Sequence, residues 1–209
     1  MRKSYLAVIF IILLSFAIGV YFYPQLPEPM ASHWNSRGDV DGYMSKFWGV
    51  FLLPLVLLGV FLLFVIIPRI DPLKNNIEKF RKYFDGLIVL LSFYFIYLYA
   101  LTIAWNLGKI FNFTLFMIPS MAALFYYCGV MIENAKRNWF VGIRTPWTMS
   151  SEEVWNKTHR LGGKLFKAAG IVALLGLAFP ECAIIFVIVP VLGASLYTIV
   201  YSYLEYRRG

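Results

Sequence analysis

The chain has 209 residues, of which 60% are hydrophobic and 14% are charged, and its formal net charge is +8. Soluble domains carry about a quarter of charged residues, so this composition excludes an ordinary soluble domain and indicates an integral membrane protein.

Six apolar segments are predicted to cross a hydrocarbon layer of about 30 Å. A backbone in lipid must satisfy its own hydrogen bonds, and the alternating pattern of a β-barrel is absent, so the segments should be helices. We therefore predict an all-α membrane protein with six transmembrane helices. An extracellular loop joins helices one and two, and a long cytoplasmic loop joins helices four and five. The predicted spans are residues 5–23, 47–67, 86–104, 113–132, 165–179 and 183–203.

The first span follows Arg2 and Lys3, as the apolar run of a signal peptide does. No small-residue cleavage site precedes the aromatic residues 21–23, so we expect an uncleaved helix. Residues 24–46 come next and are called the outer segment. Its prolines and turn-forming residues predict an irregular but compact loop. It holds the first candidate ligand-binding residues, which are His33, Trp34, Asn35, Asp39 and Asp41.

Three interpretations of this outer group remain open. Histidine and carboxylates bind metals, and Asp39–Gly42 resembles the opening of a calcium loop, but a full loop needs a glutamate where this chain has Val50. The group could instead contact a peptide or another ligand. In the structural alternative, the polar residues cap turns while His33 and Trp34 anchor the loop at the membrane interface. We predict neither a metal nor a cofactor.

A second polar stretch, residues 68–85, carries Ile77, Phe80 and Phe84 on one helical face. This spacing predicts an amphipathic helix that lies on the membrane surface or packs on the bundle.

Residues 133–164 are called the inner segment and form the longest polar stretch. Ser150 and Glu153 fit a capping box, which predicts a helix from residue 151 past 164. Gly162 and Gly163 could hinge this helix into the fifth span. The segment holds the second group of candidate binding residues, which are Asn138, Arg144, Thr145, Trp147, Trp155, His159 and Arg160.

The inner group also has more than one interpretation. A guanidinium, hydroxyls and an indole lie together in residues 144–148, where they could form a polar pocket with His159 as a proton acceptor or ligand. In the structural alternative, Glu153 is a cap, the tryptophans belong to the interfacial belt, and Arg144 and Arg160 bind lipid phosphates. Common catalytic signatures such as HExxH, GxSxG and GxGxxG are absent, so no enzyme is predicted.

The distribution of basic residues predicts the orientation. If the N-terminus lies inside, 16 lysines and arginines fall on the inner side and 3 on the outer side. Cytoplasmic loops carry such an excess, so both termini should be cytoplasmic in a multi-pass plasma-membrane protein. The net charge therefore reflects topology, and no nucleic-acid partner is expected.

Two motifs resemble a known family. KRNWFVGIRTPWTMSSEEVWNKTHRLGGKLF, residues 136–166, is similar to the signature of the SdpI family of bacterial and archaeal membrane proteins. LPEPMASHWNSRGDVDGYMSK, residues 26–46, is similar to the small domain of unknown function that often precedes it. The positions that match the signature are Asn138, Trp139, Gly142, Arg144, Thr145, Pro146, Trp147, Trp155, Thr158, His159 and Arg160.

The resemblance implies an immunity protein, which protects a bacterium from its own secreted peptide toxin and signals the toxin's presence by holding a repressor at the membrane. On this reading the outer segment meets an extracellular peptide toxin, and the inner segment meets a cytoplasmic regulator or stabilises the bundle. The alternatives are a membrane enzyme or small-molecule transporter that uses residues 144–160, and a structural protein without a ligand. We expect three parts, residues 1–67, 68–132 and 133–209.

Overall fold

The computed structural model describes residues 2–208, which are mostly helical. Two β-strands, short 3-10 turns and irregular connections make up the rest of these residues. The elements in order are α1 (Lys3–Phe22), η1 (Tyr23–Gln25), β1 (Met30–Trp34), β2 (Val40–Met44), α2 (Lys46–Ile70), α3 (Lys74–Lys79), α4 (Arg81–Asn106), α5 (Phe113–Asn134), α6 (Pro146–Ser150), α7 (Glu152–Ala173), η2 (Leu174–Leu177), η3 (Pro180–Cys182) and α8 (Ile185–Arg208).

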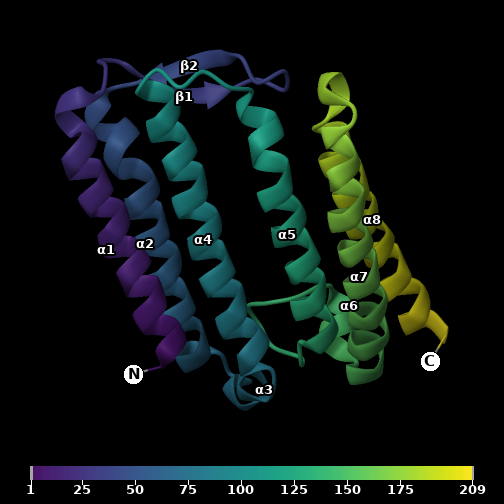
Figure 1. Ribbon diagram of the computed structural model, residues 1–209. Helices are drawn as coiled ribbons and strands as arrows, with labels where there is room; N and C mark the ends of the chain where they lie inside the picture. Colours follow the sequence, from purple (N-terminus) through teal and green to yellow (C-terminus); the bar gives the residue numbers. More distant parts are fainter. Residues whose placement is uncertain (1, 209) are drawn as a thin grey trace.

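The long helices run roughly alongside one another in two groups (Figure 1). Helices α1, α2 and α4 form one group, and α5, α7 and α8 form the other. The β-strands lie across one end, which we call the hairpin end. Helices α3 and α6 and both termini lie at the opposite end, which we call the basic end. The outer and inner segments are therefore separated by the length of the bundle.

Five helices in the described part of the chain are long and apolar enough to cross a membrane. They are α1, α2, α4, α5 and α8, and they confirm five of the six predicted spans. The other predicted span, residues 165–179, coincides with the second half of α7 and with η2. Helix α7 lies beside α5 and α8 (Figure 1), but its first half is polar, so it is not among the five.

Helix α7 packs on α5 with almost no side chain between the two backbones. A Cβ placed on Gly163 would lie 2.8 Å from the carbonyl oxygen of Gly129, and one on Gly170 would lie 2.7 Å from that of Ala122. Small residues allow such close approach of helices in membranes. The predicted hinge at Gly162 and Gly163 is wrong, because α7 continues through both residues. Gly163 instead allows the close packing of α7 on α5.

The connections at the basic end are more ordered than expected. The side chains of Ile77, Phe80 and Phe84 are at most 1% exposed and pack with Trp155 in one core cluster. Thus the predicted amphipathic face packs on the bundle, and Phe80 separates the short α3 from α4. The predicted cap of α7 is displaced by one residue, since the Ser151 side chain accepts from the Val154 N–H.

A capping box does occur in the inner segment, but on α6. The Thr145 side chain accepts from the Thr148 N–H, and the Thr148 side chain accepts from the Thr145 N–H. Part of the predicted long loop is therefore helical, as α6 and the first half of α7.

The outer segment contains a two-stranded β-hairpin, whose pairing shifts register between Ala31 and His33 and again between His33 and Trp34. Strand β1 pairs antiparallel with β2, with Met30 opposite Met44 and Trp34 opposite Val40. Gly38 in the connection has φ +86°, a conformation that glycine adopts without steric cost. The segment is irregular in its pairing, as predicted, but the two five-residue strands were not predicted; their ladder satisfies much of the backbone.

Candidate functional site

The hairpin is fixed to the helices by two asparagines. The Asn106 side chain accepts a hydrogen bond from the Ala31 N–H at 2.8 Å and donates one to the Ala31 carbonyl at 3.0 Å. Asn112, which caps α5, donates from its side chain to the Arg37 carbonyl at 2.8 Å. Neither asparagine is among the predicted site residues. The signal was present in Asn106, since a buried amide at the end of an apolar helix needs a partner.

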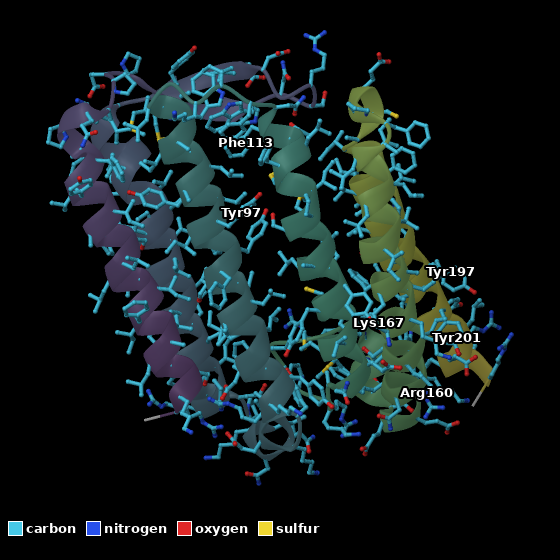
Figure 2. The ribbon with its side chains drawn as sticks, viewed as in Figure 1. Tyr97, Phe113, Arg160, Lys167, Tyr197 and Tyr201 are labelled. Carbon is cyan, nitrogen blue, oxygen red and sulfur yellow. The ribbon has the colours of Figure 1, made fainter. Side chains whose placement is uncertain are left out.

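Trp34 packs the hairpin against α5, and Asn35 closes its turn. The Trp34 ring stacks on Phe113 with centroids 3.9 Å apart and planes at 11°, and Phe113 lies just below the strands (Figure 2). The Asn35 side chain accepts from the N–H groups of Arg37 and Asp39, at 2.9 and 3.1 Å, as a turn-forming asparagine does. Both residues are therefore structural parts of the hairpin.

The side chains of the remaining three outer candidates, His33, Asp39 and Asp41, are exposed. His33 and Asp41 are 72% and 45% exposed, and they form a pair with 2.5 Å between His33 Nδ1 and Asp41 Oδ1. The Asp39 side chain is 66% exposed and lies 3.5 Å from Arg37. Exposed polar groups on a rigid support suit recognition of a partner. Under β1, a groove of about 310 Å³ lies between the hairpin, α4 and α5 and includes Trp34 and Phe113 in its wall.

His159 is buried and bonded on both ring nitrogens. Its Nε2 accepts a hydrogen bond from the Ile143 N–H at 3.0 Å, so its Nδ1 carries the proton and donates to the Trp155 carbonyl at 2.8 Å. The ring stacks on Trp155 with centroids 3.8 Å apart. Burial lowers the pKa of His159 to about 4, and the bond to Trp155 opposes the shift. The imidazole is thus neutral near pH 7 and holds the loop onto α7.

Other inner candidates also serve the fold. The Trp155 indole is fully buried and donates to the Ala135 carbonyl at 2.9 Å. Asn138 is fully buried too, and its side chain bonds the backbone of Lys136, Phe140 and Val141. These contacts close the turn that leads into α6.

A buried carboxylate that sequence analysis missed also holds this turn. Asp71 is 2% exposed, and its two oxygens accept from the backbone N–H groups of Leu73 at 2.6 Å and Trp139 at 2.9 Å. It joins the end of α2 to the inner segment. A single aspartate in a proline-flanked linker gives no sequence signal for a contact 68 residues away.

The structure brings Arg144, Thr145 and Trp147 together at one cavity. The cavity has a volume of about 580 Å³ and lies between α5 and α8, beneath residues 142–147. Arg144 is exposed, and its guanidinium donates to the Trp139 carbonyl. The Thr145 hydroxyl lies 3.0 Å from that of Ser202 on α8. The cavity differs from the predicted polar pocket, because its wall is largely apolar and does not include His159.

Arg160 stands apart from this cavity, exposed on α7 (Figure 2). A nearby charge cluster that sequence analysis missed joins α7 to α8 instead. Lys157 lies 2.9 Å from Glu153 and 3.1 Å from Glu205, and Arg208 lies 3.0 Å from Glu205. The hydrogen bonds to Glu153 and then Glu205 raise the pKa of Lys157. Glu153 therefore pairs with a lysine one turn later rather than capping the helix.

The outer and inner groups do not form one site. They lie at opposite ends of the bundle (Figure 1). Within residues 2–208, no three His, Cys, Asp or Glu side chains gather closely enough to hold a metal ion.

Similarity to known proteins extends along the whole chain. The model of the SdpI/YfhL protein family matches residues 134–202. That of a domain of unknown function, DUF1648, matches residues 10–58. The chain is also 30% identical over 209 residues to the Immunity protein SdpI of Bacillus subtilis (strain 168), a match that covers 100% of this chain and 98% of that protein. No solved structure matches the chain.

Proposed function

The chain belongs to the SdpI family of membrane proteins, and from that membership we propose that it is an immunity protein that protects its cell against a secreted peptide toxin. The match to Immunity protein SdpI along the full length of both proteins is the observation that carries this proposal. The hairpin supports it, because His33, Asp39 and Asp41 are exposed on a support that is bonded to α4 and α5.

We further propose the orientation that this role needs. The hairpin faces the outside and the basic end faces the cytoplasm, because lysine and arginine gather at that end. Helix α7 together with η2 then makes the sixth crossing. Its polar first half lies at the basic end, where the headgroup region accepts charge, and its apolar second half lies deeper.

In this proposal the two ends have different tasks. The exposed side chains of the hairpin contact the toxin, and the inner segment chiefly stabilises the bundle. Its candidate residues Asn138, Trp155 and His159 are buried and bonded within the chain, which leaves them no group for a regulator. Transfer of a signal to a cytoplasmic regulator would require two bundle states with different affinities for the toxin. The exposed Arg160 is one inner candidate that a regulator could reach.

A toxin-challenge assay tests the function. The chain is expressed in Bacillus subtilis from which Immunity protein SdpI has been deleted, and the cells are exposed to medium from the toxin-producing parent. We expect survival to return to the parental level. Survival no better than that of the deletion strain would contradict the immunity role.

A pair of matched variants then tests the role of the hairpin. Changing His33, Asp41 and Tyr43 to alanine removes exposed side chains and keeps the strand pairing and the Asn106 contact. This variant should be inserted normally and should protect poorly. The control changes three exposed residues of α7, Glu152, Asn156 and Lys164, to alanine and should protect as well as the original chain. Equal protection by both variants would rule out toxin recognition by these hairpin side chains.

A further inference from the structure

The cavity between α5 and α8 is not used by the immunity proposal. Its wall below the loop is largely apolar and includes Met131 and Ile132 of α5, Phe166 of α7 and Ile199 of α8. Its volume of about 580 Å³ is in the range of small-molecule sites, about 300–1,000 Å³. Ile199 lines the cavity and is still 44% exposed, so the cavity opens between two membrane helices.

The hydroxyl groups in the wall already have partners. Ser195 donates to the Val191 carbonyl at 2.8 Å, and Thr198 donates to the Ser195 carbonyl at 2.9 Å. The Thr145 hydroxyl is paired with Ser202 at 3.0 Å. The interior therefore suits an apolar group rather than a polar one.

Among residues 2–208, Arg144 is the only charged residue that lines the cavity. It donates one hydrogen bond to the Trp139 carbonyl, and within residues 2–208 no carboxylate forms an ion pair with it. A guanidinium has five N–H donors, so others remain free for an anion. Because its geometry matches phosphate, Arg144 makes the rim of an apolar cavity selective for negative charge.

The neighbouring aromatic residues indicate the depth of this rim. The Trp147 ring lies 5.0 Å from the Tyr203 ring, and the Arg207 guanidinium carbon lies 5.9 Å from the same tyrosine. Tryptophan and tyrosine concentrate at the level of lipid headgroups. Arg144 therefore lies at headgroup level, and the apolar wall below it lies at the level of acyl chains.

We propose that the cavity binds one anionic phospholipid of the leaflet at the basic end. Its phosphate contacts Arg144, and an acyl chain enters between α5 and α8. The lipid would fill the space under residues 142–147 and hold them against the bundle. This proposal stands on the cavity and on Arg144 and does not depend on the immunity role.

Native mass spectrometry of the full-length protein in detergent tests this proposal. The protein is titrated with phosphatidylglycerol or with phosphatidylcholine of the same acyl chains. We expect one phosphatidylglycerol to bind about tenfold more tightly than phosphatidylcholine. Both phosphates can accept from Arg144, but the choline cation of phosphatidylcholine repels the guanidinium. Arg144→Gln should abolish this preference, and Arg144→Lys should keep part of it. Ser195→Phe should weaken the binding of both lipids, because the larger side chain fills the cavity.

Arg160→Gln is the matched control, because Arg160 is an exposed arginine of the inner segment that does not line the cavity. It should bind both lipids as the original chain does. Equal losses in Arg144→Gln and Arg160→Gln would show general attraction to a basic surface and would overturn the proposal. The proposal would also be overturned if Ser195→Phe bound both lipids as tightly as the original chain. The same holds if the purified protein retained no phospholipid, or if the cavity held a peptide. Melting temperatures identify any variant that has failed to fold. If Arg144→Gln does not fold, the lipid preference of Arg144→Lys is compared with that of the original chain instead.

Discussion

His159 illustrates how the inner segment uses a residue that is often catalytic. Both of its ring nitrogens are bonded to backbone, and its ring lies against Trp155. Gly142 allows this contact, because a Cβ there would lie 2.5 Å from His159 Nε2 and its φ is +114°. A proton on Nε2 would remove the acceptor that the Ile143 N–H requires. The site therefore stabilises the neutral ring, which ties the inner segment to α7.

Acid should destabilise the protein through His159. The folded-state pKa is lowered from 6.5 to about 4, so the unfolded chain binds more protons between these values and stability falls as pH decreases through this window. From pH 7.5 to pH 5 this residue should cost about 2 kcal/mol of unfolding free energy. Denaturation in detergent at both pH values measures the loss. His159→Gln should reduce the pH dependence, and the exposed control His33→Gln should keep it. The same pH dependence in both variants would contradict this account.

At the scale of elements, close backbone contacts and polar side-chain contacts hold the helices and the hairpin together. Glycines bring α7 against α5, and side-chain amides tie the hairpin to α4 and α5. An ion pair between Lys167 and Glu133, 2.6 Å apart, also bridges α5 and α7 (Figure 2). Lipid is as apolar as leucine, so tight backbone contact and polar bonds have to supply the association that burial of apolar surface supplies in water.

The close approach of α5 and α7 should not tolerate larger side chains. Gly163→Leu would push a side chain into the backbone of α5, and overpacking of this kind typically costs about 1–3 kcal/mol. The matched control is Gly193→Leu on α8, where a Cβ would meet nothing within 4 Å. Unfolding in detergent should show a lower melting temperature for the first variant only. Equal melting temperatures would mean that the two helices are not held this closely.

At the scale of the whole molecule, the segregation of the two polar segments is the main property. The hairpin and the basic end lie at opposite ends of the helices, and both termini are at the basic end (Figure 1). A sixth crossing by α7 is consistent with that arrangement, since an even number of crossings returns the chain to its starting side. The proposed lipid and the proposed toxin contact would then act on opposite leaflets.

Cysteine labelling tests the sixth crossing. The native Cys128 and Cys182 are first replaced by alanine, and then a single cysteine is placed at exposed Glu181, between η2 and α8, or at exposed Asn156 on α7. A membrane-impermeant maleimide added to intact cells should label Glu181→Cys and not Asn156→Cys. Ser36→Cys in the hairpin connection is the external reference and should be labelled. The same labelling at residues 181 and 156 would exclude the crossing.

The sequence by itself determined the membrane class, five of the helices and the family. Apolar length decides whether a helix can span a bilayer, and that is a local property. It also identified the two polar segments. Arg144, Thr145 and Trp147 were predicted together and do line one cavity.

Only the tertiary structure decided what these residues touch. The partners of His159, Asp71 and Asn106 lie 16, 68 and 75 residues away along the chain, and no local pattern encodes such pairings. The hairpin was missed for a related reason, since its strands are short and two-stranded hairpins depend on a support, here α4 and α5, for their stability. Similarly, Gly163 reads as a flexible position in sequence, and only the neighbouring backbone of α5 shows that it is a packing position.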